Sequence, residues 1–235
     1  MVEPAKQTIL VVEDDDAIML GLEENLQFEG FHVLKADNGD DGLALALQRK
    51  PALIILDVML PGMTGYEVCK NVREKGLRTP IIMLTAREEE FDKILGFDMG
   101  TDDYMTKPFS IRELIARVKA ILRRTQVKES DQAIYQFGDF VLDSESRTLK
   151  QKGKDVPLTR TEFDLLAYLV ANAGKALSRE TLMNDVWGSD YFGTQRSLDS
   201  FVASLRKKVE KKPAEPNFIQ TVHGVGYKFD PGRKS

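Results

Sequence analysis

Polar side chains that could carry phosphoryl or metal chemistry follow short apolar runs in the first half of this 235-residue chain. Runs such as Leu-Ile-Ile-Leu before Asp57 are typical of strands buried on both faces of a parallel sheet. Such strands place their carboxyl ends at one edge, where α/β sheets bind ligands. The sequence therefore predicts one cluster of groups at this edge: Glu13, Asp14, Asp57, Thr85 and Lys107.

Several carboxylates at one point repel each other unless a cation lies among them. Oxygen ligands without His or Cys favour Mg²⁺, so we expect Asp14, Asp57 and Glu13 (directly or through water) to hold this ion. The Asp57 carboxylate could then attack phosphorus and form an aspartyl phosphate. Lys107 and Thr85 would contact the phosphoryl oxygens, and the ammonium group would neutralise charge.

Each of these residues also has a simpler explanation when it is taken alone. Asp57 could merely cap a strand-to-helix turn, and the acids of residues 13–16 could complement a helix dipole. Lys107 could be a surface lysine. Their common placement at successive strand ends favours a functional site.

The predicted elements of the first half alternate between strand and helix. Strands are expected at residues 8–13, 31–36, 52–57, 81–84 and 103–106, and helices at 17–29, 42–49, 66–75, 88–99 and 111–124. This order predicts an α/β domain with a five-stranded, doubly wound parallel sheet.

The second half has a different pattern. Short strands of an antiparallel sheet are expected at 135–142, 147–150 and 155–158, then helices at 161–172, 178–187 and 197–211, and a hairpin over 219–229. Three helices followed by a hairpin predict a smaller α+β winged helix-turn-helix domain. We place the domains at 1–124 and 134–235, with a polar linker over 125–133.

Charge supports two domains with different partners, because residues 1–127 carry 16 Lys and Arg against 22 Asp and Glu, whereas residues 128–235 carry 17 against 15. The single cysteine, Cys69, excludes a disulfide framework and is expected to be packed. Trp187 is also expected in a core. No membrane span or signal pattern is evident, so we expect a cytoplasmic protein.

Four motifs resemble the receiver domain of two-component response regulators: Val-Val-Glu13-Asp14-Asp15, Leu-Asp57-Val-Met-Leu-Pro61-Gly, Leu-Thr85-Ala86-Arg and Asp102-Asp103-Tyr104-Met-Thr-Lys107-Pro108-Phe109. With its second half, the whole chain resembles the OmpR/PhoB family, which implies a flavodoxin-like receiver. The resemblance implies that a sensor histidine kinase phosphorylates Asp57. It also implies a Mg²⁺ site made by Glu13, Asp14, Asp57 and the backbone carbonyl of Met59, a Thr85–Tyr104 switch pair, and Lys107 as phosphate ligand before a cis Pro108.

The resemblance further implies a homodimer on phosphorylation, built through the face of residues 88–124. The expected pairs across its two-fold axis are Lys93–Glu113, Asp103–Arg117 and Asp102–Arg124. The alternative is that these charges form ordinary surface pairs within one chain. The implied partners beyond the kinase are direct-repeat promoter DNA in double-stranded form and RNA polymerase, with no membrane.

The helix over 197–208 would be the recognition helix in the major groove. DNA contacts are expected from Arg196, Ser200, Ser204, Arg206, Lys207 and His223, with Lys208 as a further candidate. The helix departs from the family because few of its side chains can make bidentate base contacts. His223 stands in the wing where the family has Arg, so we expect DNA affinity to fall between about pH 6 and 8.

Two other functions are compatible with parts of this sequence. A phosphohydrolase that uses an aspartyl phosphate would commonly place a second acid two residues after the nucleophile, where this chain has Met59. We therefore expect no enzyme. A phosphorylation-controlled protein-binding module with weak or lost DNA binding is favoured by the sparse recognition helix, and salt-dependent DNA binding would discriminate against it.

Overall fold

The computed structural model describes residues 6–86, 100–123, 134–188 and 195–232, with only the backbone for Arg123 and residues 195–197. The chain forms two compact units, Met1–Leu122 and Arg123–Ser235. The predicted linker and the helix expected at 88–99 lie outside the described residues. Within the described ranges, no helix combines the length and the apolar character that crossing a membrane requires.

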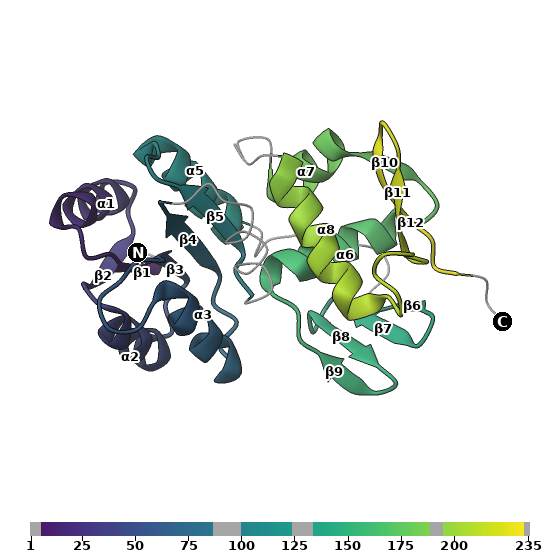
Figure 1. The fold of residues 1–235 in the computed structure, drawn as a ribbon, viewed down its shortest axis with the longest axis horizontal. Coiled ribbons are helices and arrows are strands. Elements are labelled where there is room, and N and C mark those ends of the chain that lie inside the picture. Colours follow the sequence, from purple (N-terminus) through teal and green to yellow (C-terminus); the bar gives the residue numbers. More distant parts are fainter. Residues whose placement is uncertain (1–5, 87–99, 124–133, 189–194, 233–235) are drawn as a thin grey trace, which may run out of the picture. The chain divides into compact units, whose positions relative to one another are not determined.

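Unit 1 is a parallel sheet with strand order β2-β1-β3-β4-β5. Helices α1 and α5 cover one face and α2 and α3 cover the other (Figure 1). The predicted five-stranded, doubly wound fold is confirmed. Its elements are β1 (Thr8–Val12), α1 (Asp16–Phe28), β2 (His32–Ala36), α2 (Gly39–Arg49), β3 (Leu53–Asp57), α3 (Gly65–Glu74), β4 (Ile81–Thr85), β5 (Asp103–Thr106) and α5 (Ile111–Arg123).

Local sequence explains how β3 presents Asp57 at the edge of the sheet. Every residue of β3 is buried, since strands β1 and β4 flank it and helices cover both faces. The chain then turns and begins α3 at Thr64, whose hydroxyl and the Glu67 side chain form a reciprocal capping box. At Gly65 an added Cβ would lie 2.0 Å from the carbonyl oxygen of Asp57, so only glycine fits this turn.

Unit 2 contains a four-stranded antiparallel sheet, three helices and a second, three-stranded sheet of order β10-β12-β11. This arrangement confirms the predicted smaller winged helix-turn-helix unit. Its elements are β6 (Ile134–Phe137), β7 (Phe140–Asp143), β8 (Thr148–Gln151), β9 (Lys154–Val156), α6 (Arg160–Ala171), β10 (Ala176–Ser178), α7 (Arg179–Trp187), α8 (Gln195–Val209), β11 (Ile219–Val222) and β12 (Gly226–Phe229).

Two strand predictions for unit 2 were incomplete. The single strand expected at 135–142 is a hairpin of two strands, because the chain reverses at Gly138 with φ +50°. Strand β10 was not predicted, since it has only three residues and exists through its pairing with β12. The aromatic prediction is confirmed: Trp187 is 1% exposed, and its ring centroid lies 5.3 Å from that of Phe201.

Candidate functional site

The carboxyl edge of the unit 1 sheet brings together three of the predicted residues in direct contact. The ammonium nitrogen of Lys107 lies 2.6 Å from Oδ2 of Asp57 and 2.8 Å from each carboxylate oxygen of Glu13. Glu13 follows β1, Asp57 ends β3 and Lys107 follows β5, so three separate strands supply them. The arrangement is a cation held between two buried carboxylates.

Burial and the hydrogen bonds of Lys107 shift the pKa values in this cluster in opposite directions. Burial raises the pKa of Glu13 above its ordinary value, and the nearby charge of Asp57 adds to the rise, although the hydrogen bond from Lys107 counteracts both. Burial alone would lower the pKa of Lys107, but its hydrogen bonds to Asp57 and Glu13 outweigh burial, so that this pKa is raised. Lys107 therefore stays positively charged beside Asp57 at neutral pH.

A divalent cation would find three carboxylates at this edge. One oxygen from each of Glu13, Asp14 and Asp57 lies within 4.8 Å of the others. This oxygen-only set fits Mg²⁺, which keeps several waters and needs few protein ligands. The backbone N–H of Met59 donates to Oδ1 of Asp57 at 3.2 Å, so this residue borders the cluster. Asp15, in contrast, caps α1 by accepting from Ala17 and Ile18.

Thr85 and Tyr104, the expected switch pair, lie on the same side of neighbouring strands. Tyr104 pairs in register with Met83 of β4, and Thr85 is two residues further along that strand, which returns it to the same face. Thr85 is buried, and Tyr104 packs against the apolar layer beneath α2 and α3. The Lys107–Pro108 peptide bond is cis, as expected.

In unit 2, helix α8 presents part of the predicted DNA-binding set to solvent. Lys207 is exposed and Ser200 is partly exposed, while the Arg196 side chain is outside the described residues. His223 is exposed in the turn of the β11–β12 hairpin, next to Gly224, whose φ is +74°. These positions are compatible with contact to DNA, which stays a prediction.

Ser204 and Arg206 do not lie as expected. The expected DNA contact of Ser204 is not supported by its placement, because this residue is 4% exposed and its hydroxyl donates to the buried Glu162. Arg206 donates from Nε and Nη2 to the carbonyl oxygen of Ile219, and from Nη2 to Oγ1 of Thr221. It holds the hairpin against α8, so its expected role in DNA contact is not supported by its placement.

Comparisons with known proteins agree with both halves of this arrangement. Residues 9–119 match the response regulator receiver domain, and residues 153–229 match the C-terminal domain of transcriptional regulatory proteins. The chain is 46% identical over 224 residues to the transcriptional regulatory protein AfsQ1 of Streptomyces coelicolor, covering 95% of this chain and 98% of the relative. The chain is a response regulator of the OmpR/PhoB family.

Two solved structures have a similar fold. A RitR mutant is 30% identical with a TM-score of 0.76, over 96% of this chain and 100% of that chain. The OmpR/PhoB homologue DrrB of Thermotoga maritima is 36% identical with a TM-score of 0.53, over 96% and 99%. The response regulator is thus a phosphorylation-controlled transcriptional regulator, of a family that is not enzymatic, with a histidine kinase and DNA as implied partners.

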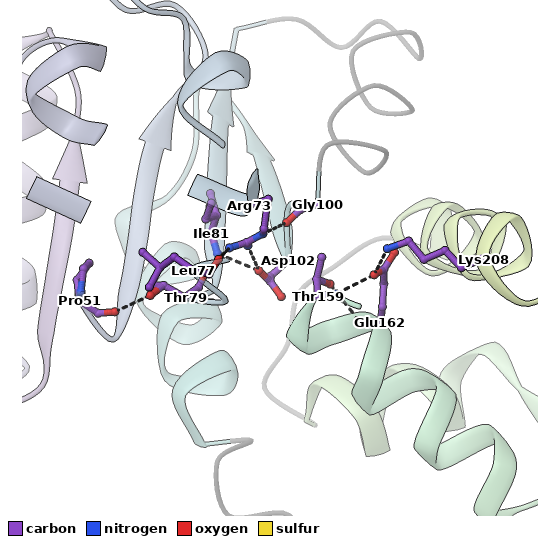
Figure 2. Close-up of polar contacts among 10 residues, drawn as sticks. All are labelled: Pro51, Arg73, Leu77, Thr79, Ile81, Gly100, Asp102, Thr159, Glu162 and Lys208. Carbon is purple, nitrogen blue, oxygen red and sulfur yellow. Dashed lines mark hydrogen bonds and ion pairs between the residues drawn. The ribbon is translucent and has the colours of Figure 1, made fainter. Parts of the chain in front are cut away.

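The charges assigned to the dimer face of this response regulator form pairs within the chain. Asp103 receives two hydrogen bonds from Arg117 at 3.0 and 3.1 Å, and Arg117 also donates to Glu113. Asp102 is 0% exposed and accepts from Arg73 at 2.9 Å (Figure 2). The other two charges assigned to this face, Lys93 and Arg124, lie outside the described residues. Pairing across a dimer therefore stays a prediction.

Two structurally important residues were missed by the sequence reasoning. Arg73 donates to the carbonyl oxygens of Leu77, Thr79 and Gly100 as well as to Asp102 (Figure 2). No local sequence pattern predicts these partners. Glu162 could have been noticed, because Thr159 stands three residues before it in the order of a capping box, which the structure contains.

Proposed function

We propose that Asp57 accepts a phosphoryl group from a sensor histidine kinase. Mg²⁺ would be held by Glu13, Asp14, Asp57 and the Met59 carbonyl. Phosphorylation would promote a homodimer through the face of residues 88–124 and binding to direct-repeat promoter DNA, where RNA polymerase is a further partner. In this proposal residues 1–124 are the receiver, 125–133 the linker and 134–235 the DNA-binding domain.

The observation that carries this proposal is the contact of Asp57 with Lys107, beside a triad of carboxylates. In the transfer, one Asp57 oxygen forms a bond to phosphorus while the bond between phosphorus and the kinase histidine nitrogen breaks. When bound, Mg²⁺ would neutralise charge on the transferring phosphoryl oxygens. Lys107 is already charged and 2.6 Å from the acceptor, so it can bind a phosphoryl oxygen after a small movement.

In this proposal, Thr85 and Tyr104, which lie on the same face of β4 and β5, respond to phosphorylation. A phosphoryl group adds nearly two negative charges and three strong acceptors. The Thr85 hydroxyl, at the end of β4, would turn toward the phosphoryl oxygens, and Tyr104 would move into the space that it leaves. The face of residues 88–124 would then repack. A local change at the phosphorylation site would thereby shift the equilibrium between two arrangements of this face.

A small phosphodonor tests the acceptor directly, and beryllofluoride, which mimics the phosphoryl group without transferring one, tests dimerisation. With Mg²⁺ present, we expect phosphorylation of one residue, mapped to Asp57 by mass spectrometry after borohydride reduction, and a dimer by sedimentation. Asp57→Asn should abolish both results. The matched control is Asp16→Asn, an exposed acid in the first turn of α1, which should retain both. An unmodified Asp57 and an unaltered sedimentation coefficient would overturn the proposal.

A second candidate is a phosphorylation-controlled module that binds protein and has weak or lost DNA binding. It is favoured by the outer face of α8, where Ala203 is exposed and Asp199 is engaged by Arg179 and Tyr227. Titration of phosphorylated protein with random-sequence duplexes at several salt concentrations distinguishes the candidates. Salt-dependent binding supports the transcriptional role, and its complete absence supports the second candidate.

A further inference from the structure

Glu162 is a buried acid of α6 that lies against the recognition helix. It is 1% exposed, and it is the third residue of the helix that Thr159 caps. The backbone N–H of Thr159 donates to its Oε2 at 2.8 Å. That contact completes the capping box, but a carboxylate has capacity for several more hydrogen bonds. The remaining partners come from α8.

Two donors from α8 reach the Glu162 carboxylate. The hydroxyl of Ser204 donates to Oε1 at 2.6 Å, and the ammonium group of Lys208 donates to Oε2 at 2.5 Å (Figure 2 shows the Lys208 contact). Ser204 and Lys208 are four residues apart, so they lie on one face of the helix, which is the face turned to α6. Both oxygens of the buried acid are thereby engaged, and its charge is paired.

These contacts favour the observed register of α8 against α6. A shift of α8 along its axis or a rotation by one residue would remove both donors and leave a buried carboxylate with its charge uncompensated. Apolar contacts alone would resist such a shift less, because they are not directional. Buried polar groups are used in other helical assemblies to specify register in this way.

We propose that Glu162 is a positioning residue for the recognition helix. By holding Ser204 and Lys208, it determines which α8 side chains face outward, namely Ser200, Ala203 and Lys207. It would therefore control sequence discrimination by this domain, while it touches no DNA itself. Lys208 belongs to this contact rather than to the set that binds phosphates. The inference rests on the proposed DNA-binding function.

The test compares two duplexes, one selected from a random pool by the phosphorylated wild-type protein and one of scrambled sequence. The main variant is Glu162→Gln with Lys208→Met, which removes the buried charge and its partner together, so that no uncompensated ion remains. Its unfolding transition is measured first. We expect the variant to fold and the ratio of its affinities for the two duplexes to fall about tenfold or more. The salt slope, which is the slope of log affinity against log salt concentration, should be unchanged.

Lys207→Met is the matched control, since Lys207 is exposed and adjacent to Lys208. It should weaken binding to both duplexes equally, reduce the salt slope by about one and leave the affinity ratio unchanged. Should the double variant fail to fold, Ser204→Ala provides a milder test, because it removes one hydroxyl donor. It is expected to lower the ratio by less than the double variant, again with an unchanged slope.

Two results would overturn the role of Glu162. One is an affinity ratio in the folded variant that stays within about twofold of the wild-type ratio. The other is a Lys208→Met variant that loses salt slope as Lys207→Met does, which would make Lys208 a phosphate contact. Absence of salt-dependent binding by the wild-type protein itself would instead overturn the proposed DNA-binding function.

Discussion

The ammonium nitrogen of Lys107 lies 2.6 Å from Oδ2 of Asp57 while it also contacts both oxygens of Glu13. The lysine thus supplies a positive charge to the same carboxylates that are proposed to bind Mg²⁺. Metal and ammonium group would repel each other across a few ångströms, in a partly buried site where screening by solvent is weak. This relationship leads to the first prediction.

Replacing Lys107 by Met should strengthen Mg²⁺ binding by about tenfold, because a competing positive charge is removed from the carboxylates. The same variant should lose the response to phosphorylation, since no ammonium group remains to bind the phosphoryl oxygen. Calorimetric titration with Mg²⁺ at pH 7 measures the first effect and sedimentation with beryllofluoride the second. Lys119→Met, at an exposed pair with Glu29, is the control and should change neither. Weaker Mg²⁺ binding in Lys107→Met would contradict the prediction.

Gly65→Ala should lower the free energy of unfolding of unit 1 by about 2 kcal/mol or more, because the added methyl group would lie 2.0 Å from the Asp57 carbonyl oxygen. The backbone of Asp57 must shift to relieve this overlap, so phosphorylation should also become slower. Urea denaturation and the rate of modification measure the two effects. In the control, Gly21→Ala, the methyl group meets only the end of the Ile111 side chain at 3.2 Å. A Gly65→Ala protein as stable as the control would contradict this account.

Cys69 should resist alkylation in the folded protein. Burial raises the pKa of its thiol to about 12, so that the reactive thiolate is about 10⁻⁴ of the total at pH 8. The direction follows because burial disfavours the charged form of an acid. We expect iodoacetamide to leave the native protein unlabelled up to about pH 10 and to label it rapidly in guanidinium chloride. Native labelling at the rate of a free thiol would show that this part of unit 1 opens readily.

Arg73→Met should destabilise unit 1 by about 3–5 kcal/mol, because it leaves the fully buried Asp102 carboxylate without this cation. Asp102 also accepts from the backbone N–H of Ile81 at 3.0 Å, so the start of β4 should be loosened as well. Urea denaturation measures the loss. Lys70→Met removes an exposed pair with Glu74 on the same helix and should cost under about 1 kcal/mol. Equal losses in the two variants would argue against a structural role for Arg73.

The sequence alone determined the family and predicted which residues form the proposed phosphorylation site. Continuous apolar runs, without alternation of polar residues, predicted the central strands. The positions of Glu13, Asp57 and Lys107 at strand ends predicted that these three side chains would lie close together. These inferences were possible because, in a repeated strand–helix pattern, the residue that follows each parallel strand lies at the same edge of the sheet. Local signals such as the cap at Thr64 were also readable, since their partners are only a few residues away.

Tertiary structure decided which charged and polar side chains are available to a partner. Ser204, Arg206 and Lys208 look like a DNA-contact set in the sequence, yet the structure turns them toward Glu162 and the β11 backbone. Asp102 likewise reads as a surface acid and is buried against Arg73, 29 positions away. Such pairings depend on how elements distant in the chain are packed, and one residue's type and spacing do not specify a partner that another helix or strand supplies.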